Sequence, residues 1–201
     1  MATRQFHRPT EADHDASADR RLSFARLLLT GAVGGLGRVL RPRLKVLCDV
    51  LRVSDLAPVR ALLKDVNAVV QLGGISTEHA FEEIQPANIL GTYNVCEAAR
   101  EHVVRRIVFA SSNPVTGFYT QPGTIDARMP VRPDGYDGLS KAFGEKLAQF
   151  CFERHGIETV SLRIGSSFAE PADRRMLAGW LSFGDLERRV LAAPPSRRAS
   201  R

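Results

Sequence analysis

A glycine-rich turn between an apolar run and a helical segment constrains the fold more than any other part of this chain. The apolar run covers residues 25–29, and the turn follows it from Thr30 to Gly37. Glycines at positions 31, 34 and 37 let the backbone turn sharply, approach a ligand without a Cβ in the way and pack the next helix closely on the strand. The free N–H groups and positive dipole at the start of such a helix suit a pyrophosphate. The pattern therefore predicts a strand, a tight turn and a helix start.

An acidic residue further along favours nucleotide binding over a glycine-rich loop without a ligand. Asp55 lies 18 residues after Gly37, at the end of the apolar-rich segment 49–56. A carboxylate at the tip of a second strand can accept hydrogen bonds from both hydroxyl groups of a ribose. The glycine turn and Asp55 together indicate a dinucleotide site.

Apolar periodicity predicts alternating strands and helices along the chain. The predicted strands are residues 25–29, 50–53, 68–72, 106–110 and 159–164, and the predicted helices are residues 35–44, 81–101 and 138–155, with short helices within 56–67 and 176–193. This alternation predicts an α/β fold with a Rossmann-like, doubly wound parallel sheet. Only one short helix separates the second and third strands, where a doubly wound fold would have a helix, a strand and a helix. We therefore expect the sheet to lack one strand.

Two details of the helices follow from single residues. Pro42 lies well inside the first helix, where it removes an N–H at a cost of ~3 kcal/mol, so we expect this helix to end or kink early. In the helix over 138–155, one stripe is predicted to carry Leu139, Ala142, Phe143, Leu147, Phe150 and Cys151. Gly156 is the residue expected to end that helix.

The charge of +6 is concentrated at one end of the chain. Seven arginines from Arg174 onward stand against two acidic residues, so the rest is close to neutral. This argues against a nucleic-acid partner and for an ordinary soluble enzyme. No apolar run approaches the ~20 residues of a membrane span. We interpret residues 1–24 as a disordered extension, 25–193 as one domain and 194–201 as a basic tail.

The cysteines and histidines give no sign of a metal site. Cys48, Cys96 and Cys151 are widely spaced and form no CxxC pair, which is typical of reduced thiols in a cytoplasmic protein. The five histidines also lack metal-ligand spacing.

With the later motifs added, the chain resembles the extended short-chain dehydrogenase/reductase family of NAD-dependent epimerases and dehydratases. These motifs are the segment 88–94, the strand end at Ser111 and Ser112, and the region 138–145 with Lys141. Within the family, the resemblance is strongest to the bacterial uronate dehydrogenases and covers about residues 25–190. The closer likeness is carried by residues 72–76, 107–113, 132–135, 163–166 and 175–177.

The resemblance implies oxidation of the C1 hydroxyl group of a hexuronic acid, in its ring form, to an aldarolactone with NAD as the hydride acceptor. Asp55 would favour NAD over NADP, because a carboxylate repels a 2′-phosphate. The implied cofactor-binding residues are Gly31, Gly34, Gly35, Leu36, Gly37, Asp55, Leu72, Gly73, Gly74 and Lys141.

The resemblance also assigns the substrate side. Ser112 would hydrogen-bond the reacting oxygen, while Ser76, Asn113 and Ser166 would help to hold the uronic acid. Arg175 would pair with its carboxylate, because a planar guanidinium can bind a carboxylate through two hydrogen bonds.

The catalytic helix departs from the family pattern. The family needs a tyrosine four residues before the lysine, because positions i and i+4 lie on one helix face. Lys141 would hold the nicotinamide ribose and lower the tyrosine pKa so that the phenolate acts as the base. Here Asp137 occupies that position, and Tyr136 lies about 140° around the helix from Lys141. Aspartate is shorter and, with an ordinary pKa of ~3.9, a weak base, so we expect much reduced turnover.

Three functions stay open at this point. The chain is an NAD-dependent dehydrogenase, a non-catalytic NAD-binding protein that lost its base, or a relative of the nucleotide-sugar epimerases and dehydratases. The third is disfavoured because we expect the C-terminal substrate-side elements of the family to be missing. A homo-oligomer is compatible with each function.

Overall fold

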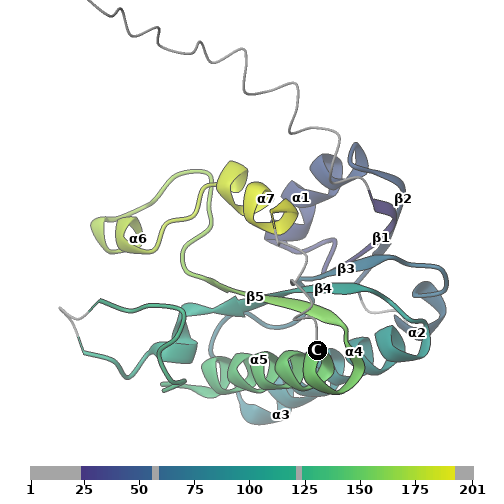
Figure 1. The fold of residues 1–201 in the computed structure, drawn as a ribbon. Helices are drawn as coiled ribbons and strands as arrows, with labels where there is room; N and C mark the ends of the chain where they lie inside the picture. Colours follow the sequence, from purple (N-terminus) through teal and green to yellow (C-terminus); the bar gives the residue numbers. More distant parts are fainter. Residues whose placement is uncertain (1–23, 56–58, 121–123, 193–201) are drawn as a thin grey trace, which may run out of the picture.

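Five parallel strands form the sheet at the centre of the computed structural model, which describes residues 24–55, 59–120 and 124–192 (Figure 1). The strands are β1 (Phe24–Thr30), β2 (Cys48–Ser54), β3 (Ala68–Gln71), β4 (Arg106–Ser112) and β5 (Glu158–Ile164). The predicted α/β class and the five predicted strands are confirmed. The predicted extension 1–24, apart from Phe24, and the predicted tail 194–201 lie outside the described residues.

The strand order is β2-β1-β3-β4-β5, so the chain changes direction across the sheet between β1 and β3. Thr30, at the end of β1, pairs with Ser54 of β2 on one side and with Gln71 of β3 on the other. Parallel sheets bind ligands in the crevice outside such a switch point. Within the described residues β2 is an edge strand, and the strand that we expected to be absent is absent there.

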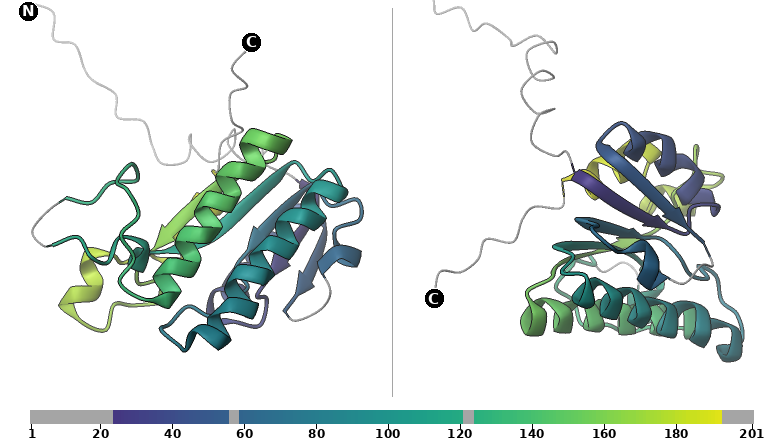
Figure 2. Two further views of the ribbon diagram at one scale, coloured as in Figure 1. Left: turned by 90° about the horizontal axis from the view of Figure 1, so that it is seen from below. Right: turned by 90° about the vertical axis from the view of Figure 1, so that its right-hand side faces the viewer.

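Helices cover both faces of the sheet (Figure 2). The helices of three or more turns are α1 (Gly35–Lys45), α4 (Gly91–Glu101) and α5 (Tyr136–His155), and the shorter ones are α2 (Val59–Leu62), α3 (Phe81–Ile84), α6 (Arg174–Ala178) and α7 (Phe183–Leu191). Leu27 and Leu29 of β1 point into a core shared with α1 and α7, whereas Leu28 points into a second core shared with α4 and α5. No helix among the described residues is long and apolar enough to cross a membrane.

The expectation that α1 ends early at Pro42 is wrong. The helix continues to Lys45, and Leu40 and Leu44 on its inner face are fully buried. Pro42 lies on the exposed side in the last turns, where the carbonyl group that loses its N–H partner can bind water. Packing of the two leucines therefore outweighs the local cost of the proline.

The helix predicted over 81–101 is present but contains a wider segment. Between α3 and α4, residues Gln85–Leu90 form a π-helical segment, η2. Pro86 has no N–H with which to continue the α-helical pattern from α3, which favours a locally different hydrogen-bond spacing. The segment brings Asn88 into the buried side of the helix, and such segments are frequent at functional sites.

Only part of the apolar stripe predicted for the next helix, α5, is buried. Ala142 and Cys151 are buried, and Leu147 packs against the core. Leu139, Phe143 and Phe150 are 47%, 38% and 52% exposed. Small residues face the sheet instead, and a Cβ on Gly144 would lie 2.4 Å from the Phe109 ring. The helix approaches the sheet too closely for large side chains on that side. It ends, as predicted, at Gly156, whose φ is +70°.

Candidate active site

The glycine turn joins β1, α1 and the loop after β3 in one close-packed crossing. Gly31 has a φ of +66°, and a Cβ there would lie 2.7 Å from the backbone nitrogen of Gly73. A Cβ on Gly37 would lie 2.0 Å from the carbonyl oxygen of Gly31. Gly35, by contrast, faces open space, with nothing within 4 Å of an added Cβ. The turn is thus packed on its inner side and open on its outer side.

The first turn of α1 has backbone N–H groups that have no partner within the helix. Gly34 precedes the helix without a side-chain cap, and the first turn, which begins with Gly35 and Leu36, contains no acidic residue. The N–H groups and the positive end of the helix dipole therefore face the open side of the turn, and no acidic residue of that turn neutralises them. This arrangement suits a phosphate group.

A buried polar network fixes the turn to the loop after β3. The Thr30 hydroxyl donates to Oε1 of Gln71 over 2.6 Å and accepts from the N–H of Gly73 over 3.2 Å. Leu72 packs against the core from the same loop. Asp55 follows β2 at the same edge of the sheet and is exposed. We did not predict Gln71 as a site residue from the sequence, although a glutamine at the end of an apolar strand was a signal for such a role.

Lys141 lies where the ends of β3 and β4 meet α5. It is 5% exposed, and its Nζ donates to the carbonyl oxygen of Ala110 over 3.1 Å. A Cβ on Gly74 would lie 3.7 Å from the same nitrogen. Burial lowers the pKa of Lys141 from its ordinary value, and the Asp137 carboxylate acts in the opposite direction.

Asp137, and not Tyr136, shares this environment with Lys141. Asp137 is 3% exposed, and its Oδ1 has no hydrogen-bond partner in the described part of the chain. Burial raises its pKa above the ordinary value, while Lys141 acts to lower it. Tyr136 is 49% exposed and its ring lies 5.4 Å from that of Phe81. The helical spacing predicted this separation correctly.

Glu78 contacts the start of α5, which the sequence did not predict. Its carboxylate accepts hydrogen bonds from the backbone N–H groups of Tyr136, over 2.8 Å, and Asp137, over 3.0 Å. These two bonds lower the pKa of Glu78. The loop after β3 therefore caps the first turn of α5, and no short-range pattern connects positions so far apart in the sequence.

Asn88 makes the second connection between the same loop and α5. Its side chain accepts from the N–H of Ile75 over 2.7 Å and donates to the Ile75 carbonyl oxygen over 2.9 Å. It also donates to the Ser140 hydroxyl over 2.8 Å, and that hydroxyl donates to the Asp137 carbonyl oxygen over 2.7 Å. The asparagine thus positions both the loop and the helix turn that carries Asp137.

The predicted substrate residues come from three strand ends. Ser112 pairs in register with Ile164, so Asn113 and Ser166 follow neighbouring strands. A Cβ on Gly165 would lie 2.5 Å from Nδ2 of Asn113, which shows how closely these two ends approach. Ser76 is exposed on the loop after β3.

Arg175 lies on α6, in a segment that returns to the end of β5. The N–H of Ser166 donates to the carbonyl oxygen of Gly179 over 3.0 Å, and Ser166 forms an isolated bridge with Trp180. The side chain of Arg175 is outside what the structure describes. Its pairing with a carboxylate stays a prediction.

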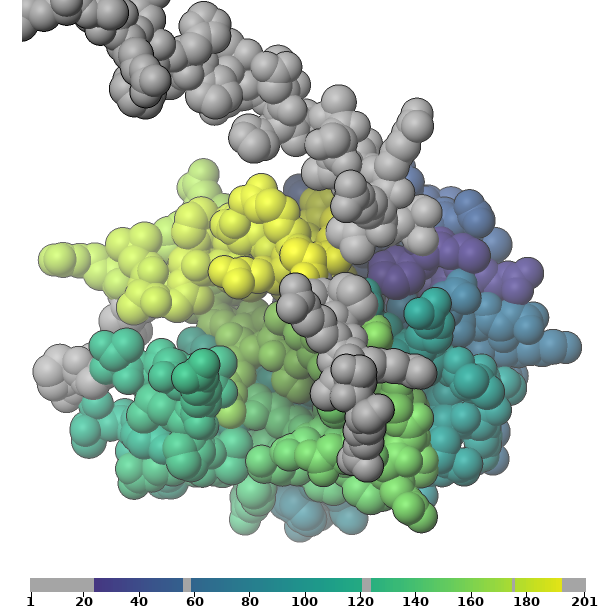
Figure 3. Space-filling model, in the orientation of Figure 1, coloured from purple at the N-terminus to yellow at the C-terminus, as the bar shows by residue number. Residues whose placement is uncertain are grey.

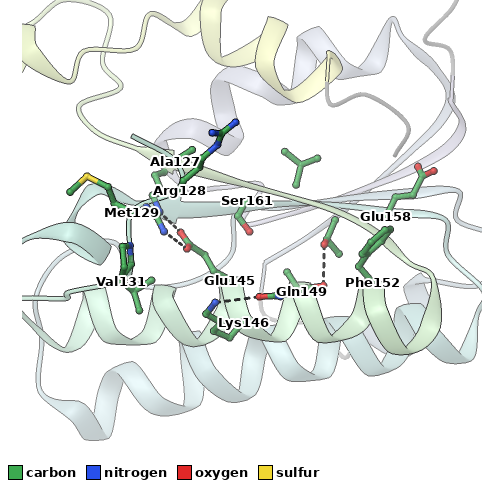
Figure 4. Close-up of a pocket in the computed structure, with 15 residues that line it drawn as sticks. Ala127, Arg128, Met129, Val131, Glu145, Lys146, Gln149, Phe152, Glu158 and Ser161 are labelled. Atoms are coloured by element: carbon green, nitrogen blue, oxygen red, sulfur yellow. Dashed lines mark hydrogen bonds and ion pairs between the residues drawn. The ribbon is translucent and has the colours of Figure 1, made fainter. Parts of the chain in front are cut away.

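A cavity of about 490 Å³ lies elsewhere, between β5, α5 and the loop 127–131 (Figure 4). The space-filling view shows a hollow on the side of the molecule that faces the viewer. The hollow lies between the segment carrying α6 and α7 above and the region of α5 below (Figure 3). Arg163 forms two hydrogen bonds to Glu145 at the cavity wall, over 2.9 and 2.8 Å. None of the predicted site residues lines this cavity, so the candidate site is defined by the strand ends and not by the cavity.

Comparisons with known proteins identify the family of this chain. A model of the NAD dependent epimerase/dehydratase family matches residues 27–182. The uronate dehydrogenase of Pseudomonas putida is 54% identical over 184 residues, which are 81% of this chain and 69% of that protein.

Solved structures of uronate dehydrogenases are also similar to this chain. A mutated uronate dehydrogenase superposes with a TM-score of 0.83 at 44% identity, covering 88% of this chain and 71% of that chain. A uronate dehydrogenase variant from Agrobacterium tumefaciens, complexed with NAD, superposes with a TM-score of 0.79 at 44% identity, covering 82% and 70%. The five-stranded sheet and its helices therefore match about 70% of each of these dehydrogenases.

Proposed function

Because this chain belongs to the NAD dependent epimerase/dehydratase family, we propose that it oxidises the C1 hydroxyl group of a hexuronic acid to an aldarolactone, with NAD as the hydride acceptor. The observation that carries the proposal is the burial of Lys141 between the loop after β3 and the end of β4. A buried cation at that point can hold the ribose of a dinucleotide that starts at the glycine turn. The free thiols Cys48, Cys96 and Cys151 agree with a cytoplasmic enzyme.

The residues at the turn fit the cofactor. The uncapped first turn of α1 offers N–H groups to a pyrophosphate, and Gly35 leaves space beside them. Asp55, exposed after β2, can accept hydrogen bonds from the adenosine ribose and disfavours a 2′-phosphate. NAD, when bound, supplies the acceptor for the hydride from C1.

The substrate residues act on the other side of Lys141. Ser112 donates a hydrogen bond to the C1 oxygen and holds it in place, and Asn113, Ser166 and Ser76 bind the remaining hydroxyl groups. Arg175 pairs with the carboxylate of the uronic acid, which distinguishes this substrate from a neutral sugar.

Asp137 accepts the proton from the C1 hydroxyl group in this proposal. Burial raises the pKa of its carboxyl and so makes it a stronger base than an exposed aspartate. Its side chain is nevertheless shorter than a tyrosine, and the distance to the substrate is correspondingly greater. Slow turnover follows from that length.

The aspartate at position 137 also favours a second candidate function. A chain with the glycine turn intact and an aspartate at the base position can bind NAD without oxidising a substrate. Isothermal titration with NAD+ and NADH, combined with an NADH absorbance assay on galacturonate and glucuronate, separates the two. Turnover supports the dehydrogenase, and binding without turnover selects the non-catalytic protein.

We also propose a homo-oligomer in which a second copy covers the outer face of α4 and α5. Leu90 and Tyr93, beside and on α4, are 48% and 46% exposed, and Leu139 and Phe143 of α5 are 47% and 38% exposed. Large apolar side chains exposed on two neighbouring helices are the kind of surface that a second copy could cover.

A further inference from the structure

The outer edge of β5 lies open at the wall of the cavity between β5, α5 and the loop 127–131. Within the described residues β5 pairs with β4 alone, so β5 forms one edge of the sheet. We propose that this edge binds an extended acidic segment of a partner protein, which joins the sheet as a further strand. Neither the cofactor site nor the proposed reaction uses this edge, so the docking site is separate from the proposed function.

The backbone of β5 offers hydrogen-bonding groups to such a strand. The N–H of Glu158 donates to the carbonyl oxygen of Arg105, just before β4, over 2.9 Å, and β5 stays in register with β4 along its whole length. In a parallel ladder, alternate residues turn their N–H and C=O groups to the same neighbouring strand. The backbone groups of Thr159, Ser161 and Arg163 therefore point away from β4. An unpaired row of this kind is a template for another strand.

The shape of the molecule around this edge suits a single extended segment. β5 runs along the hollow between α7 and α5, which Figures 1 and 3 show in the same orientation. The cavity of about 490 Å³ lies on the α5 side of the edge, where Thr159, Ser161 and Arg163 line it together with residues of α5 and the loop 127–131 (Figure 4). Because helices flank the edge above and below, one strand fits there better than the edge of a second whole sheet.

The two faces of β5 provide different surroundings for the side chains of an added strand. On one face, the Thr159 hydroxyl donates to a carbonyl oxygen of α5 over 3.0 Å, and Arg163 binds Glu145 of the same helix. On the other face, Val160 and Leu162 pack against the apolar core shared with α1 and α7. Side chains alternate between the two faces of any strand. The added strand would therefore place polar residues toward α5 and apolar residues toward α7.

Unpaired positive charge at the cavity favours an acidic segment. The carboxylates that line the cavity are already in ion pairs, Glu145 with Arg163 and Glu158 with Arg106. Arg128 and Lys146 also line it, and in the part of the chain that the structure describes neither forms an ion pair; the Lys146 ammonium donates to the neutral amide of Gln149. Aspartate or glutamate side chains on the α5 side of the added strand would supply the complementary negative charge.

The test titrates the full chain, without NAD, against a fluorescently labelled peptide of alternating valine and glutamate that matches the 7 residues of β5. We expect saturable binding, measured by fluorescence anisotropy, that weakens as salt is added, because exposed charges are screened. The same peptide with lysine in place of glutamate should bind at least about tenfold more weakly. Equal binding of the two peptides, or no saturation up to ~1 mM of the glutamate peptide, would overturn the proposal.

Arg128→Glu combined with Lys146→Glu reverses the unpaired charge of the cavity. This double variant should bind the glutamate peptide at least about tenfold more weakly than the wild type. Arg41→Glu combined with Lys64→Glu is the matched control, since it makes the same change in net charge at exposed positions that do not line the cavity. The control should bind as the wild type does. An equal loss of binding in both double variants would mean that net charge alone attracts the peptide, and would overturn the proposed site.

Amide hydrogen exchange, followed residue by residue by NMR, locates the peptide on the wild-type protein without requiring any variant to fold. We expect bound peptide to slow exchange at Thr159, Ser161 and Arg163, and to leave β2, the other edge strand of the described sheet, unchanged. Protection of β2 instead would overturn the proposal. Slow exchange at the three β5 amides before peptide is added would also overturn it, because the edge would then be covered already. NAD binding is not needed for any of these measurements, so failure of the proposed function leaves the result interpretable.

Discussion

Oε2 of Glu78 accepts a hydrogen bond from the backbone N–H of Asp137 over 3.0 Å, so the loop after β3 caps the helix that carries the candidate base. The first turn of α5 has no side-chain cap of its own. The carboxylate therefore satisfies two N–H groups that the helix leaves free and places a negative charge at the positive end of its dipole.

Replacing Glu78 by alanine should lower the thermal stability of the protein and weaken any turnover, because the first turn of α5 loses both acceptors. Thermal unfolding followed by circular dichroism checks the first effect. The interaction should be present near neutral pH and lost as the pH falls through the lowered pKa of Glu78. Glu82→Ala, on exposed α3, is the matched control. Equal melting of the two variants would contradict the capping role.

Asp137→Tyr should raise uronate-dependent NADH formation by about 100-fold or more, because a positioned general base is worth about 100- to 10,000-fold. The substitution puts the phenol on the helix face of Lys141, which Tyr136 cannot reach. Initial rates with galacturonate and glucuronate measure the effect. Tyr136→Phe should leave the wild-type rate unchanged. If Asp137→Tyr folds, binds NAD and is no faster than wild type, the argument for a missing tyrosine is wrong.

Asp137→Asn should make the protein more stable than wild type at neutral pH. Burial raises the pKa of Asp137, so the folded state holds the proton to a higher pH than the unfolded state does. The wild-type protein therefore loses stability as the pH rises from the ordinary pKa of an aspartate through the raised one. Urea unfolding between pH 4 and 8, taken at roughly unit steps across these pKa values, should show the variant and wild type converging in acid. A constant difference at every pH would exclude this cause.

Local chemistry predicted most of the fold. Apolar runs located the five strands, the glycine turn from Gly31 to Gly37 located the passage from strand to helix, and helical periodicity separated Tyr136 from Asp137. Each of these depends on residues that are close in sequence or on a regular repeat. The same periodicity predicted the buried face of α5 only in part, since the sheet beneath it selects small residues such as Gly144 and leaves Leu139 and Phe143 exposed.

The parts that the sequence did not reveal depend on tertiary contacts. The burial of Leu40 and Leu44 decides that α1 continues past Pro42. Asn88 and Glu78 acquire their partners only when the loop after β3 reaches α5. Their positions in the chain carry no short-range signal of these contacts.

Gly35→Asp should weaken NAD binding at least about tenfold, which is ~1.4 kcal/mol, because the carboxylate would stand where the pyrophosphate meets the first turn of α1. An added Cβ at this position meets nothing within 4 Å, so the fold should be unaffected. Isothermal titration with NAD+ measures the change. Gly35→Ala is the control and should bind almost as well as wild type. Unchanged affinity in the aspartate variant would place the cofactor elsewhere.

Leu139→Glu combined with Phe143→Glu should convert the proposed oligomer to a monomer. Both side chains are exposed on the outer face of α5, at 47% and 38%, so charges there should not disturb the core. In an oligomer, however, each charge would be buried against a second copy at a cost of several kcal/mol, in the range found for uncompensated buried charges. Analytical ultracentrifugation of the wild type and the variant gives the two masses, and circular dichroism checks that the variant is folded. Arg41→Glu, exposed on α1 on the opposite face of the sheet, is the control and should leave the mass of the wild type unchanged. A wild-type protein that sediments as a monomer would disprove the proposed interface.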